Sequence, residues 1–145
     1  MDKKKHIYFR DERKDDLDVL AMIASACDGL VYISETDAPV TPVDLGRADS
    51  IDGETILQRA GLNEGTVVSE VEAKTFFAKL TTTKEEQSNT QKTRAKMFLT
   101  LQQVLEKHLR SLKVYRFGTI RIDILIVGLG DVGRILGVRT NAVET

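Results

Sequence analysis

Alternating apolar residues mark the C-terminal part of the chain as a sheet. In residues 119–127, isoleucines fall at every second position from Ile120 to Ile126. The alternate positions 119, 121 and 123 hold the polar residues Thr, Arg and Asp. Such period-2 alternation of β-branched residues predicts a strand with one buried face. The glycine-rich residues 128–133 then predict a loop, and residues 134–140, which include Ile135 and Val138, predict a returning strand.

Helical spacing of apolar residues identifies two longer segments. In residues 13–27 apolar side chains recur three or four positions apart, and the following Asp28-Gly29 pair is typical of a helix end. A long helix is predicted after Glu85, because apolar residues again share one face. That face comprises Met97, Leu101, Val104, Leu105, His108 and Leu112, and Phe98 and Leu109 lie beside it. Shorter helices are predicted at 54–60 and 72–80, and strands at 30–33, 66–71 and 114–117.

Residues 34–49 contain both prolines of the chain, Pro39 and Pro42. Proline lacks a backbone N–H and opposes regular structure. Because long loops often carry functional residues, this segment is predicted to be a functional loop.

Length and composition limit the class of protein. A chain of 145 residues fits a single domain with one core and can bury about 68–70% of its unfolded surface. We expect this domain over residues 13–145, preceded by a flexible extension over residues 1–12. The single cysteine, Cys27, excludes an intrachain disulfide, and no apolar run reaches the ~18 residues of a membrane span. The charged residues 10–16 argue against a secretory signal, so a cytoplasmic location is expected.

The small net charge of −1 hides an uneven distribution. Residues 35–72 hold nine acidic and two basic residues, whereas residues 73–145 hold thirteen basic and six acidic residues. These blocks could form one surface that attracts a cationic partner and another that attracts an anionic partner. Alternatively, they could be two solvated faces whose electrostatic fields cancel. Basic residues decorate the long helix and its flanks, which makes nucleic-acid binding an alternative function. They are Lys92, Arg94, Lys96, Lys107, Arg110 and Lys113.

Motifs for catalysis are weak. The run Gly-Leu-Gly-Asp-Val-Gly at 128–133 fits the G-x-G-x-x-G pattern, but too few residues follow it for the helix, second strand and acidic residue of a dinucleotide site. We interpret it as a hairpin loop, with a nucleotide-binding enzyme as a further alternative. A nucleophile and base could come only from Cys27, His6 and His108. Cys27 and His108 lie on apolar helix faces, where packing roles are expected.

Four blocks of the sequence form a recognisable combination. They are Ala24-Ser25-Ala26-Cys27-Asp28-Gly29-Leu30-Val31-Tyr32-Ile33-Ser34-Glu35, Phe76-Phe77 before Thr81-Thr82, Val114-Tyr115-Arg116-Phe117-Gly118, and Val143-Glu144-Thr145. Together, over about Asp16 to Thr145, they resemble the nuclease A inhibitor family. The resemblance implies an α+β fold, a three-layer α/β/α sandwich with a mixed, largely antiparallel sheet. It further implies an inhibitor, not an enzyme, that blocks a sugar-non-specific endonuclease of the ββα-metal type and is monomeric when free.

The resemblance also assigns roles to particular residues. In the family, the C-terminal threonine reaches the nuclease's catalytic Mg²⁺ and a glutamate of the Ser-Glu motif assists there; these positions are Thr145 and Glu35. An Asp-Trp pair in a loop adds contacts and corresponds to Glu85 and Glu86, so the aromatic anchor is missing here. The expected partner-binding residues are Glu35, Thr82, Glu85, Glu86, Glu144 and Thr145. No cofactor of its own is expected, only contact with the partner's metal through Thr145.

The end of the sequence leads to the same expectation. The chain stops at Thr145, directly after strand-like residues, so we expect an ordered terminus that presents a carboxylate and a hydroxyl at a fixed place. A carboxylate that is ionised at neutral pH can replace a phosphate oxygen at a hard cation. Two alternatives stay open: Glu35 could instead brace the proline-containing loop, and a divergent family member could bind another protein.

Overall fold

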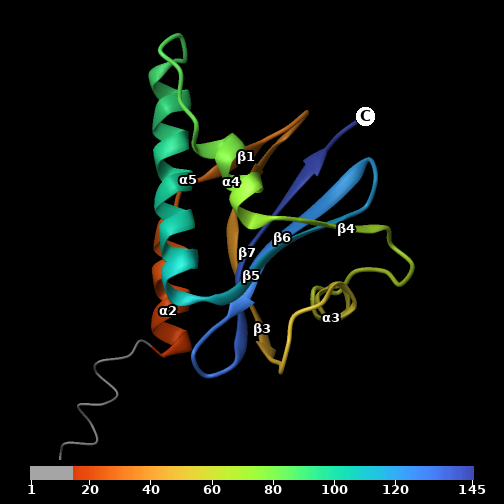
Figure 1. Ribbon diagram of the computed structural model, residues 1–145. Helices are drawn as coiled ribbons and strands as arrows, with labels where there is room; N and C mark the ends of the chain where they lie inside the picture. Colours follow the sequence, from red (N-terminus) through yellow and green to blue (C-terminus); the bar gives the residue numbers. More distant parts are fainter. Residues whose placement is uncertain (1–14) are drawn as a thin grey trace, which may run out of the picture.

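Helices and strands alternate irregularly along residues 15–145, the part of the chain described by the computed structural model (Figure 1). The helices are α2 (Asp16–Cys27), α3 (Gly53–Arg59), α4 (Ala73–Thr81) and α5 (Asn89–His108). The strands are β1 (Val31–Ile33), β2 (Asp37–Pro39), β3 (Thr41–Arg47), β4 (Val68–Val71), β5 (Arg110–Phe117), β6 (Arg121–Leu129) and β7 (Arg134–Val143). The predicted extension, residues 1–12, lies outside the described residues. The α+β class is confirmed.

The main sheet has five strands in the order β3-β7-β6-β5-β4, and β1 and β2 form a separate two-stranded ribbon. Each pairing in the main sheet is antiparallel. The prediction of a largely antiparallel sheet is therefore confirmed, but the parallel pairing of a mixed sheet is not found among the described strands. The reason lies in the connections: β5, β6 and β7 follow one another through short turns, and such turns join only antiparallel neighbours.

Both faces of the sheet are buried at its centre. Successive residues of a strand point to opposite faces, and in β6 every residue from Ile124 to Leu129 is buried. On one face, Ile122, Ile124 and Ile126 pack with α2, α4 and α5. On the other face, Leu125 and Val127 pack with α3. The expectation of one core is wrong, since alternating residues of the same strands feed two clusters. Among the described helices only α3, with 7 residues, packs on the second face. One short helix does not cover that face as a complete layer, so the three-layer sandwich stays a prediction.

The prolines do not prevent strand formation, and the prediction of a long loop over residues 34–49 is wrong. β2 and β3 occupy most of that segment. β3 is an edge strand, and Pro42 lies there opposite Val138 of β7. An edge strand tolerates proline because one of its sides lacks a partner for the backbone N–H. Pro39, in the β1–β2 ribbon, accepts a hydrogen bond at its carbonyl from Oγ1 of Thr140 at 3.0 Å.

The long helix α5 starts later and ends earlier than its apolar pattern suggested. Ser88 caps it, and its side chain and that of Gln91 form a reciprocal capping box. The helix ends at His108, and the backbone of Leu109 is extended. Leu112 therefore belongs to β5 and not to the apolar helix face. Ile120 also departs from the alternation pattern, because it is 56% exposed and lies in the turn before β6.

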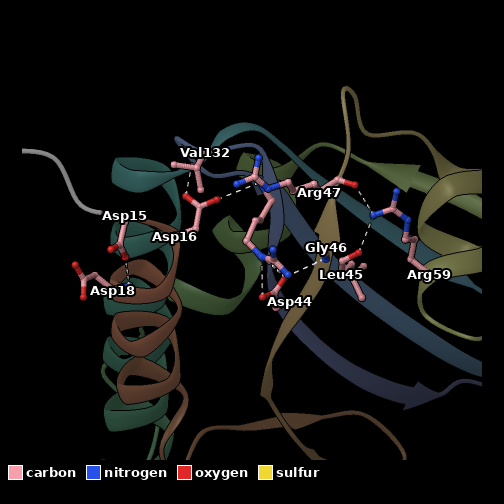
Figure 2. Close-up of polar contacts among 10 residues, drawn as sticks. Asp15, Asp16, Asp18, Asp44, Leu45, Gly46, Arg47, Arg59 and Val132 are labelled. Atoms are coloured by element: carbon pink, nitrogen blue, oxygen red, sulfur yellow. Dashed lines mark hydrogen bonds and ion pairs between the residues drawn. The ribbon is translucent and has the colours of Figure 1, made fainter. Parts of the chain in front are cut away.

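A buried carboxylate, that of Asp16, holds the β6–β7 turn against the start of α2 (Figure 2). It accepts hydrogen bonds from the backbone N–H groups of Val132 and Arg134 at 3.2 and 3.0 Å. The Arg134 guanidinium in turn binds Asp44 of β3 at 3.0 Å. On the same edge, Arg59 of α3 donates to two carbonyls of β3. One chain of polar contacts thus fixes α2, the turn and β3 relative to one another.

The glycine-rich residues 128–133 form a hairpin connection, as predicted. β6 continues to Leu129, a turn follows, and β7 returns from Arg134. Gly133 has a φ of +88°, which favours glycine. At Gly130 an added Cβ would collide with the Asp16 carboxylate. The pattern therefore serves a tight turn over a buried carboxylate and lacks the helix of a dinucleotide site.

Candidate partner-binding site

The last two residues, Glu144 and Thr145, continue beyond β7 as an ordered tail (Figure 1). The backbone N–H of Glu144 donates to the carbonyl of Ile120 in the β5–β6 turn at 2.9 Å. The Glu144 carboxylate accepts a charge-assisted hydrogen bond from the Arg116 guanidinium at 2.6 Å. Glu144 is thus fixed through both its backbone and its side chain.

The turn between β1 and β2 lies against this tail. Its own conformation is set by Ser34, whose N–H and hydroxyl both donate to the carbonyl of Thr36, at 2.9 and 3.0 Å. The Ser34 hydroxyl oxygen also accepts from the N–H of Val143 at 3.1 Å, and the Glu35 N–H donates to the Val143 carbonyl at 3.3 Å. The Ser-Glu pair is therefore joined to the end of β7.

Glu35 holds Thr145 directly. Its carboxylate accepts from the Thr145 backbone N–H at 2.6 Å and lies 2.9 and 3.0 Å from the Thr145 hydroxyl oxygen. The structure thus brings together two residues 110 positions apart. Glu35 does act as a brace, but it braces the tail and not a proline-containing loop.

Charges of both signs surround the tail. Glu35 and Glu144 are exposed acids, Arg116 pairs with Glu144, and the exposed Arg121 lies opposite Val143 at the end of β7. Burial opposes the charge of Arg116, but its hydrogen bond and attraction to Glu144, with a smaller contribution from Tyr32, raise the pKa of the guanidinium above its ordinary value. Arg116 stays charged and neutralises Glu144, whereas Glu35 has no ion-pair partner within residues 15–145.

The loop predicted to add contacts lies between α4 and α5. The Thr82 hydroxyl donates to the carbonyl of Ala78 at 2.7 Å and is used within the helix end. Glu85 and Glu86 are exposed in the turn that follows. Within residues 15–145, no hydrogen bond or ion pair links this loop to Glu35 or Thr145. Both lie toward the same end of the molecule, the upper end in Figure 1.

Three residues of this site, Tyr32, Ser34 and Arg116, lie in the sequence blocks that carry the family resemblance but are not among the predicted site residues. Ser34 connects the turn to β7, and Arg116 pairs with Glu144. Position alone could have indicated Arg116, because it is a charged residue between the buried Tyr115 and Phe117 of a strand. Its partner could not be read from the sequence, because Glu144 lies 28 residues further along the chain.

Of the candidate nucleophile and bases, Cys27 has a structural role, and His6 lies outside the described residues. Cys27 is 5% exposed, and burial raises the pKa of its thiol to about 11, so it is a poor nucleophile. The basic helix face is also incomplete. The Arg110 guanidinium donates to the Gly130 carbonyl at 3.4 Å, and Nζ of Lys113 donates to the Ile51 carbonyl at 3.4 Å. Both cations are thus engaged with backbone carbonyls of the protein itself, which leaves Lys92, Arg94, Lys96 and Lys107 as the other basic residues of the set.

Fold and site together define an α+β protein with a five-stranded antiparallel sheet, a two-stranded ribbon and an acidic tail held by hydrogen bonds. The chain belongs to the nuclease A inhibitor-like protein family, whose family model matches residues 17–145. No curated protein sequence matches the chain significantly. Within residues 15–145 no helix has the length and apolar character required to cross a membrane.

Proposed function

We propose that this protein inhibits a metal-dependent, sugar-non-specific nuclease of the ββα-metal type by placing its tail at the partner's catalytic metal ion. Membership of the nuclease A inhibitor-like family supports an inhibitory role. The observation that carries the proposal is the pair of contacts by which Glu35 holds the backbone and hydroxyl of Thr145. A chain end fixed in this way can bind without the entropy loss of ordering a flexible tail.

The chemistry of the tail suits a hard cation. Nuclease metal ions of this kind, such as Mg²⁺, prefer oxygen ligands, and they hold a phosphate oxygen during catalysis. The main-chain carboxylate of Thr145, with a reference pKa of roughly 3.5, is ionised at neutral pH and offers two oxygens. The Thr145 hydroxyl donates its hydrogen to Glu35, so its oxygen still has a free lone pair for a metal ion or metal-bound water. Thr145 would therefore occupy the place of the scissile phosphate.

Glu35 has two roles in this proposal. It orients Thr145, and its remaining lone pairs can accept from metal-bound water or from a cationic side chain of the partner. The tail and the exposed acids beside it would complement the positive groove that binds DNA. Electrostatic complementarity of this kind mainly accelerates association and selects the partner.

The loop between α4 and α5 supplies the second part of the proposed interface, through Thr82, Glu85 and Glu86. In place of the family's tryptophan, Glu86 presents a charge, and the chain has no tryptophan at all. Loss of a buried aromatic anchor typically costs at least about 2 kcal/mol of binding energy. Unless another surface replaces that contact, affinity will be lower than in family members with the tryptophan. We propose a cytoplasmic protein, monomeric when free and without a cofactor of its own.

The experiment is digestion of plasmid DNA by a purified ββα-metal nuclease with Mg²⁺, in the presence of this protein. Appending a few residues after Thr145 should abolish inhibition without changing the melting temperature, because the carboxylate is then replaced by a peptide bond. Glu35→Gln should weaken inhibition about tenfold, the effect of losing a charged hydrogen-bond acceptor. Asp37→Asn removes the same charge from the same ribbon without touching the tail, so it serves as the matched control. Full inhibition by the extended protein would refute the mechanism.

Two other functions predict different results. A divergent family member with another protein partner would bind that protein through the same tail but would leave the nuclease active. A nucleic-acid accessory protein would retain DNA in a salt-dependent manner through Lys92, Lys96 and Lys107, and would not need Thr145. The tail-extended variant therefore separates the nucleic-acid role from both protein-binding roles.

A further inference from the structure

A hollow beside the tail has the properties of a receptor for a single side chain. It has a volume of about 340 Å³ and lies between α4, the β1–β2 ribbon, β5 and the tail. Its walls include Tyr32 and Phe76, Val71 and Leu80, and Arg116 and Glu144. This volume is at the lower end of the roughly 300–1,000 Å³ of ligand pockets, so the hollow suits one large side chain better than a cofactor.

The hollow combines aromatic, aliphatic and cationic walls. The rings of Tyr32 and Phe76 are nearly parallel, with an interplanar angle of 5° and centroids 6.0 Å apart. Arg116 is held at one end by its 2.6 Å ion pair with Glu144. Lys79, an exposed residue of α4, contributes a second cation to the lining. Aromatic rings pack favourably against other rings and against guanidinium and ammonium groups, so these walls favour an aromatic occupant.

The position of the hollow relates it to the tail. Glu144 lines the hollow and directly precedes Thr145 in the chain. A partner that binds the Thr145 carboxylate must therefore come within one residue of the hollow's rim. The exposed Lys79 and Thr75 lie on the α4 side of the same rim and leave it accessible.

We propose that the partner nuclease inserts an aromatic side chain into this hollow, between α4 and the tail. The inference rests on the proposed function and adds the source of the missing anchor. In this protein Glu86 occupies the position of the family's tryptophan. The aromatic side chain of the interface therefore comes from the nuclease, and the inhibitor provides the hollow that receives it: a reversed anchor. Hot spots of interfaces are commonly aromatic side chains that fill pockets on the partner and lose their contact with water on binding.

The test uses the full chain and a purified ββα-metal nuclease loaded with Mg²⁺, with the dissociation constant as the readout. In Thr75→Trp, the new indole lies at the rim and competes for the hollow. We expect the dissociation constant to rise about 30-fold, the size of a hot-spot loss. Lys74→Trp is the matched control, because Lys74 is the adjacent exposed residue of α4 and lines a different hollow, against α5. It should change the dissociation constant less than twofold.

Because the chain has no tryptophan, the introduced indole also reports its own position by fluorescence. A blue-shifted emission in Thr75→Trp, compared with Lys74→Trp, would place the indole in the hollow. If Thr75→Trp does not fold, Thr75→Arg covers the rim with a side chain that needs no burial, and the same loss is expected.

The tail-extended protein, assayed in parallel, separates the two proposals. Loss of binding by the extended protein together with wild-type binding by Thr75→Trp, with its indole in the hollow, would overturn the inference about the hollow and leave the inhibitory mechanism intact. Wild-type binding by the extended protein would overturn both. Loss of binding in both variants, with Lys74→Trp unaffected, is the result that supports the reversed anchor.

Discussion

At the scale of single residues, Glu35 determines whether the tail has one conformation. Its carboxylate is the acceptor for both the N–H and the hydroxyl of Thr145. In Glu35→Ala these donors turn to water, because both residues are exposed. We expect the ¹⁵N order parameter of the Thr145 amide to fall from about 0.85 to below about 0.6, with little change in melting temperature. Asp37→Ala is the control, and an unchanged order parameter in Glu35→Ala would show that β7 alone orders the tail.

Cys27 gives a prediction about pH. Burial raises the pKa of its thiol to about 11, whereas an unfolded cysteine has a pKa of roughly 8.5. A group with a raised pKa favours folding only while it is protonated. Its contribution is therefore complete below about pH 8.5 and is lost as the pH rises toward the folded value. Urea unfolding should show a steeper loss of stability across this window for the wild type than for Cys27→Ala, and parallel pH profiles would contradict the assignment.

At the scale of elements, local sequence patterns correctly predicted the segments whose conformation does not depend on their place in the assembled sheet. The isoleucine alternation located β6, and helical spacing located α2 and α3 to within a few residues. β2 and β3 were missed because Pro39 and Pro42 suggested a loop, and only the position of β3 at the sheet edge makes its proline acceptable. Edge position is a property of the assembled sheet and not of the segment.

The candidate site shows the same limit more strongly. Its two central residues, Glu35 and Thr145, were identified through family resemblance, but the hydrogen bonds between them were not foreseen. A contact across 110 residues depends on how the β1–β2 ribbon lies against the end of β7. Ser34 sets that arrangement by joining the turn to Val143. No local periodicity encodes such a contact, so the sequence supplied the participants and the fold supplied their geometry.

The connection between α2 and the β6–β7 turn depends on Asp16. Replacing it with alanine leaves two backbone donors, those of Val132 and Arg134, in a partly buried place without their acceptor (Figure 2). At about 1–3 kcal/mol for each unsatisfied donor, we expect a loss of about 3 kcal/mol in the free energy of unfolding. Urea denaturation provides the measurement.

Asp18→Ala is the matched control for Asp16→Ala, because it removes an exposed acid from the same first turn of α2. It should stay within about 0.5 kcal/mol of the wild type. Equal effects of the two substitutions would mean that the charge at the helix start, and not the hold on the turn, stabilises the protein.

At the scale of the whole molecule, the two charged blocks of the sequence are not separated in space. Asp44 of the acidic block pairs with Arg134 of the basic block, and Arg116 of the basic block pairs with Glu144 of the tail. The acids that the structure places at the tail are Glu35 and Glu144. If the tail enters a positive groove, these two acids will steer the encounter, whereas Lys107 lies at the end of α5 that is far from the loop before Asn89.

This arrangement predicts how salt acts on inhibition. Raising the ionic strength from about 0.1 M to about 1 M shortens the Debye length from about 10 Å to about 3 Å, so steering by the tail should be lost. We expect the association rate with the nuclease to fall roughly tenfold or more, with a smaller change in the dissociation rate. Stopped-flow mixing at several salt concentrations measures both rates. The double variant Lys96→Gln and Lys107→Gln, which neutralises exposed cations of α5, should keep the wild-type rates. A slower association of that variant would instead make α5 part of the binding face and would favour a different partner surface.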